Sequence, residues 1–69
     1  MNILLLIGQL LSMLANNALV QKIVQCLLTN TSWAAIMTCV AAQKTGDPHE
    51  DAMIDLIVAT LDKHAKANP

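Results

Sequence analysis

The chain has 69 residues, of which 55% are apolar and only 13% charged, and its formal net charge at pH 7 is −1. An average soluble domain is about a quarter charged. This composition excludes a disordered segment, a multidomain protein and a basic nucleic-acid-binding surface. A chain of this length buries only about 60% of its unfolded surface, so much apolar surface stays outside unless another chain or a lipid covers it.

The charged residues are concentrated in the C-terminal third of the chain. Lys22 is the only charged residue before Lys44. Leucine and alanine, both good helix formers, are the commonest residues, and no stretch alternates apolar and polar residues as a half-buried strand does. We therefore predict a single all-α domain over residues 1–69, made of an apolar helical hairpin over residues 1–44 and an amphipathic helix over residues 47–66.

The first half of the hairpin is predicted to be helical, but its polar face changes direction. On a helical wheel Gln9, Ser12 and Asn16 share one face, whereas the polar residues from Gln21 onward share nearly the opposite face. Either the chain breaks here, with Asn17 capping a second helix, or one long helix is buried differently in its two halves. Because no glycine or proline marks the position, we favour a continuous helix, and hence three helices rather than four.

A chain reversal is predicted at residues 30–32, followed by an amphipathic helix over residues 33–44. The reversal has the sequence Asn-Thr-Ser, and either Asn30 or Ser32 can cap the next helix. The triplet also matches the N-glycosylation pattern, but its simpler interpretation is a turn-and-cap cluster. The apolar stripe of the helix comprises Trp33, Ile36, Met37, Val40 and Ala41.

Residues 45–50 mark the clearest boundary in the chain. Gly46 suits the left-handed position after a helix, Asp47 can cap the next helix, and Pro48 suits its first position. Glu50, three residues after the cap, completes the pattern of a capping box. Acidic residues then precede basic ones along the helix, as its dipole favours, and Asp62 and Lys66 are spaced for an ion pair.

Two cysteines lie six to seven residues on either side of the centre of the predicted reversal, which falls between Ser32 and Trp33. An antiparallel hairpin would place Cys26 and Cys39 at about the same level, where a disulfide could form if the helices cross closely. The alternative is that both are free thiols buried as small hydrophobic residues. A disulfide would imply an oxidising compartment, whereas the run at residues 3–14 lacks the basic start and the cleavage site of a secretory signal. The sequence alone favours the cytoplasm or a membrane surface.

The sequence predicts no catalytic, cofactor or metal site. His49 with Asp51, and His64 with Asp62, are spaced two apart, so their side chains diverge on a helix. No CxxC or HExxH pattern is present, and no serine has a recognisable base partner. We therefore expect a protein that is not an enzyme and has no small-molecule substrate.

The leading functional hypothesis is a helical protein that assembles with copies of itself through its apolar N-terminal region. Scattered amides on that region fit a protein interface, where buried polar groups fix register. The alternatives are a small membrane protein with a two-helix hairpin, and an adaptor whose apolar groove receives a partner's helix. No nucleic-acid partner is expected. The predicted assembly face comprises Ile3, Leu4, Ile7, Leu11, Leu14, Trp33, Ile36, Met37 and Val40.

Overall fold

The computed structural model describes residues 3–14 and 16–67, and within them it confirms the all-α prediction with four helices. The side chains of Ile3 and Leu4 lie outside the described part. The helices are α1 (Ile3–Leu11), α2 (Asn17–Thr29), α3 (Trp33–Ala41) and α4 (Pro48–Ala67).

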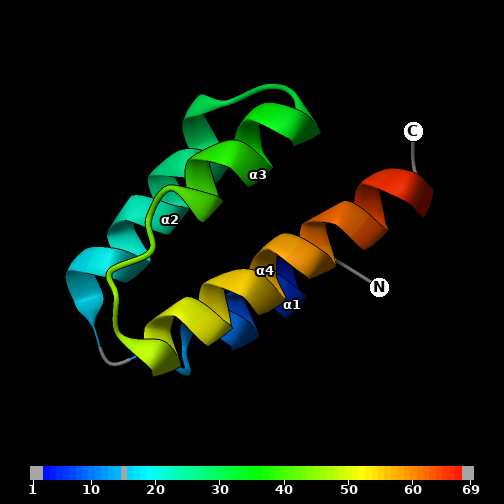
Figure 1. Ribbon diagram of the computed structural model, residues 1–69. Coiled ribbons are helices and arrows are strands. Elements are labelled where there is room, and N and C mark those ends of the chain that lie inside the picture. Colours follow the sequence, from blue (N-terminus) through cyan, green and yellow to red (C-terminus); the bar gives the residue numbers. More distant parts are fainter. Residues whose placement is uncertain (1–2, 15, 68–69) are drawn as a thin grey trace.

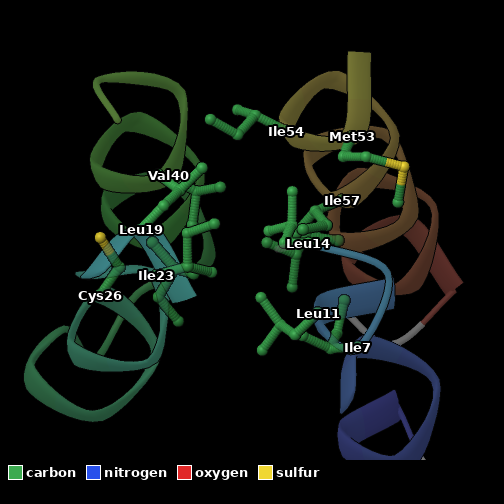
Figure 2. Packing of buried hydrophobic residues seen from close by; sticks show 12 residues of the cluster. Ile7, Leu11, Leu14, Leu19, Ile23, Cys26, Val40, Met53, Ile54 and Ile57 are labelled. Carbon is green, nitrogen blue, oxygen red and sulfur yellow. The ribbon is translucent and has the colours of Figure 1, made fainter. Parts of the chain in front are cut away.

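The four helices form two facing pairs. Each helix runs antiparallel to the one before it, and the long α4 crosses the molecule with α1 against it (Figure 1). α4 also packs against α3, and α3 packs against α2. Figure 2 shows side chains of α2 and α3 facing those of α1 and α4 across the core. The first helix is therefore held by the last, although they lie at opposite ends of the sequence.

The predicted continuous N-terminal helix is wrong, because α1 ends at Leu11 and α2 begins at Asn17. The cap of α2 is Asn16 rather than Asn17. Its side-chain oxygen accepts a hydrogen bond from the backbone N–H of Leu19 at 3.2 Å. Such a bond satisfies one of the N–H groups that the first turn of a helix leaves without a backbone partner.

The break between α1 and α2 explains why the polar face changes direction in the sequence. A straight helix would have turned one of its two polar faces into the core, where unpaired side-chain amides are costly. With the chain broken, the polar residues of both helices reach solvent. The exposed side chains are Gln9, Ser12, Gln21, Lys22, Gln25 and Thr29.

The reversal between α2 and α3 lies where the sequence predicts it. Asn30 caps the end of α2, and Ser32 caps the start of α3. The side chain of Asn30 donates to the backbone carbonyl of Cys26 at 3.0 Å, at the end of α2. The hydroxyl of Ser32 accepts from the backbone N–H of Ala35 at 3.1 Å and caps α3. Both helix ends at the reversal are thus satisfied by local side chains.

The segment between α3 and α4 differs from the prediction at its start. α3 ends at Ala41 rather than at residue 44, and Gly46, with a φ of +91°, is the residue of the described chain that has a positive φ. The backbone N–H groups of Thr45 and Gly46 donate to the carboxylate of Asp51 at 2.9 and 3.4 Å. The first turn of α4 therefore fixes the backbone of residues 45–46 through hydrogen bonds to Asp51.

Asp47 caps α4, but the predicted capping box takes a different form. The carboxylate of Asp47 accepts from the backbone N–H groups of His49 and Glu50 at 2.9 and 3.0 Å. The carboxylate of Glu50 accepts instead from the hydroxyl of Thr45 at 2.7 Å, and that hydroxyl in turn accepts from the N–H of Asp47 at 3.3 Å. Thr45 thus stands between the two groups that a capping box would join directly.

Two ion pairs lie on the surface of α4. Lys66 lies 3.0 Å from Asp62, as their spacing predicts, and Lys44 lies 2.7 Å from Asp55. The hydrogen bond and the negative charge of Asp55 raise the pKa of Lys44 above its ordinary value. Because all four side chains are substantially exposed, these pairs add little to stability.

The hydrophobic core takes side chains from all four helices and from the turn after α1. They recur at spacings of three and four, as on one face of a helix. The buried side chains are Ile7, Leu11, Leu14, Leu19, Ile23, Cys26, Ile36, Val40, Met53, Ile54, Ile57 and Leu61.

Truncating Ile57 is expected to destabilise the protein strongly. Its side chain is 0% exposed at the centre of α4, so Ile57→Ala leaves a cavity and lowers the free energy of unfolding by about 2–5 kcal/mol. The neighbouring Leu56 is 47% exposed, and Leu56→Ala is expected to cost less than about 1 kcal/mol. Urea denaturation followed by circular dichroism measures both changes. Equal losses in the two variants would contradict the packing described here.

Candidate functional site

Most side chains of the predicted assembly face pack within a single chain. Trp33 and Met37 pack partly buried against the core, and the side chains of Ile3 and Leu4 lie outside the described part. Side chains buried within one chain are not free to contact another, so the surface that this structure leaves open to a partner lies elsewhere. The predicted residues that lie in the core are Ile7, Leu11, Leu14, Ile36 and Val40.

A disulfide bond joins Cys26 on α2 to Cys39 on α3, with the two Cα atoms 5.6 Å apart. Cys26 continues the buried row of α2, and Figure 2 shows its sulfur directed away from the side chains of α4. Cys39 lies off the buried stripe of α3, on the side that faces α2. The bond therefore lies at the outer edge of the core and ties the two helices of one pair together.

An open groove of about 630 Å³ runs along α2 beside this bond. Its walls combine small and apolar side chains with the amides of three glutamines, and Lys22 is the single charged residue among them. The two cysteines are part of this lining, so the disulfide faces the groove. The lining residues are Ala18, Gln21, Lys22, Val24, Gln25, Cys26, Thr29, Cys39 and Gln43.

Gln43 connects the groove to the disulfide. Its side-chain nitrogen donates to the backbone carbonyl of Cys39 at 3.1 Å and lies 4.0 Å from the sulfur of Cys26. Gln43 could not be singled out from the sequence, because it lies beyond the end of α3 and no local motif brings it toward α2. Its only signal in the sequence is its position four residues after Cys39, which suits a contact back along a helical turn.

The outer face of α2 also carries the most exposed large hydrophobic side chain of the described residues. Leu28 is 74% exposed, next to the groove residues Gln25 and Thr29. Leu5 and Met13 are exposed near α1, and Leu56 on α4. Single exposed apolar residues are ordinary, whereas an apolar side chain beside a weakly polar groove indicates a contact surface.

The described residues offer little else for chemistry. No three histidine, cysteine, aspartate or glutamate side chains in residues 3–14 and 16–67 converge as metal ligands would. His64 contacts the ring of Trp33 edge-on, with ring centroids 5.1 Å apart, and so joins the end of α4 to the start of α3. None of the described helices has both the length and the apolar content needed to cross a membrane.

Removing the disulfide is expected to lower stability. The bond closes a loop between residues 13 apart, and for a loop of about this size the loss is about 2–4 kcal/mol in the free energy of unfolding. The double variant Cys26→Ala, Cys39→Ala leaves no free thiol and can be compared with the oxidised protein by urea denaturation. As a control, a dithiol reductant should destabilise the natural sequence and leave the double variant unchanged. A loss below about 0.5 kcal/mol would contradict this expectation.

Comparison with known proteins does not extend this description. No protein-family model matches the chain. No curated protein and no solved structure matches it either. The candidate site is therefore defined by its own residues: the α2 groove, the disulfide that lines it, and the exposed Leu28 beside it.

Proposed function

We propose that the protein is a non-catalytic helical protein that self-associates through the outer face of α2. The observation that carries this proposal is the position of Leu28, 74% exposed beside an open groove that contains one charged residue. The proposal keeps the self-assembly predicted from the sequence and moves its surface from the apolar stripes, which are buried, to the opposite side of α2.

Burying this face supplies a favourable free energy of association. Fully covering one leucine side chain contributes about 1.5–3 kcal/mol, and a symmetric contact covers two. A typical stable interface takes about 800 Å² from each partner, which is close to a fifth of the 4408 Å² that the chain exposes. The face of α2 and the adjoining end of α3 thus have to meet the partner together.

A second copy is the partner that this face suits best. The amides of Gln21 and Gln25 each carry donors and an acceptor, so they can pair with the same residues of another copy around a two-fold axis. The face carries only Lys22, and the whole chain has a net charge of −1, so repulsion between copies is small. Amides within an apolar contact also fix its register.

Substituting Leu28 is expected to weaken self-association. We expect the natural protein at micromolar concentration to have a mass of at least two chains by size-exclusion chromatography with light scattering. Leu28→Glu should shift the association midpoint at least about tenfold toward higher concentration, because it places a charge in the apolar contact.

Leu56→Glu is the matched control, since it introduces the same charge at an exposed leucine of α4. Both variants should remain helical by circular dichroism, because both side chains lie on the surface. A monomeric natural protein at micromolar concentration, or equal effects of the two variants, would contradict the proposal.

A further inference from the structure

We propose that the Cys26–Cys39 bond is a site of thiol–disulfide exchange with a fixed direction. A small thiol, as its thiolate, attacks the sulfur of Cys39, and Cys26 is the leaving group. The inference goes beyond self-association: it concerns which sulfur reacts in the single chain, where the α2 groove is open, whereas a second copy on the α2 face would cover that groove.

Access to the two sulfurs differs. An exchange reaction requires the incoming thiolate to contact one sulfur of the bond. Cys26 is 1% exposed within the core, whereas Cys39 is partly exposed, and both line the open groove. A groove of about 630 Å³ has room for a small-molecule thiol. Attack at Cys39 is therefore the more open route, because Cys26 is almost fully covered by the core.

Burial in the core disfavours a negative charge on the sulfur of Cys26, and two nearby groups offset this effect. The side-chain nitrogen of Gln43 lies 4.0 Å from the sulfur of Cys26 and can donate to it. The same nitrogen contacts the backbone carbonyl of Cys39, not its sulfur. Lys22, one helical turn before Cys26, lines the same groove and adds positive charge. A donor and a nearby cation stabilise a thiolate, and a more stable thiolate leaves faster.

The reaction balances with two molecules of a monothiol. In the first step the thiolate forms a bond to the sulfur of Cys39, the bond between the two cysteines breaks, and its electron pair leaves on Cys26. In the second step another thiolate attacks the reagent's sulfur in the mixed disulfide and releases Cys39. The protein disulfide gains two electrons and two protons, and two thiols are oxidised to one small disulfide.

Opening the bond affects one half of the fold. The bond ties α2 to α3, while α4 holds α1 and α3 by noncovalent packing. Exchange therefore loosens the pair of helices that forms the groove and leaves the buried stripe of α4 in contact with its neighbours. The groove can in this way exist in a covalently closed and an open form, set by the supply of thiol.

The direction of exchange can be mapped in the natural protein. The oxidised protein, diluted below the midpoint of any self-association so that the groove is open, is treated briefly with reduced glutathione, quenched with acid and digested, and mass spectrometry locates the glutathione. We expect about tenfold more glutathione on Cys39 than on Cys26. Equal amounts, or more on Cys26, would overturn the proposal. So would a reduction rate equal to that of global unfolding, because the bond would then react only in the unfolded chain.

Gln43 provides a second, independent test. Gln43→Leu removes the donor beside Cys26, and the control Gln9→Leu removes an exposed amide of α1 outside the groove. We expect Gln43→Leu to slow exchange about threefold and to lower the ratio of Cys39 to Cys26 product, with Gln9→Leu close to the natural protein. An effect on stability alone would not change this ratio. An unchanged ratio in Gln43→Leu would contradict its role as the donor to the leaving sulfur.

Discussion

The fold depends on the packing of one apolar stripe, that of α4. Met53, Ile54, Ile57 and Leu61 are all buried, and α4 contacts both α1 and α3. Because α1 and α4 come from opposite ends of the sequence, the core closes only when both ends of the chain are in place. The pair of α2 and α3 is stabilised differently, because a disulfide bond reinforces its packing. The molecule thus has one half held by burial alone and one half held by burial and a disulfide.

The distribution of buried apolar residues and exposed charges decides which contacts the surface can make. The excess of apolar residues that the composition shows is partly absorbed, because the described part of the chain buries twelve of them in its core and packs eight more against it. The surface of α1, α2 and α3 nevertheless carries a single charge, at Lys22. The exposed leucine and amides of α2 are therefore available for a contact that needs no charged partner, and the disulfide beside them is available to thiols. Both proposals concern the same side of the molecule, so a second copy on α2 would cover the groove through which a thiol reaches the disulfide.

Much of the architecture could be predicted from local patterns. The reversal at residues 30–32, the cap at Asp47 and the left-handed Gly46 follow from residue types at fixed positions. The break after Leu11 was visible as a reversal of the polar face, but no glycine or proline marked it, and the capping by Asn16 decided it.

The order of packing could not be predicted, because nothing local says that α1 contacts α4 rather than α2. A hydrophobic stripe likewise does not reveal whether its partner is in the same chain, and five residues of the predicted assembly face pack in the core of this one. The approach of Gln43 to Cys26 is equally a product of tertiary packing.

The disulfide also sets how far the chain can be drawn out. An extended chain covers about 3.4 Å per residue, so the segment between Cys26 and Cys39 would span about 44 Å if it were free. With the bond intact, its ends stay 5.6 Å apart at their Cα atoms. A molecule pulled by its two termini would thus release α1 and α4 to full length and still withhold roughly 40 Å of chain. A machine that unfolds proteins by threading them from one end would have to pass the closed loop alongside the rest of the chain, until a thiol opened the loop.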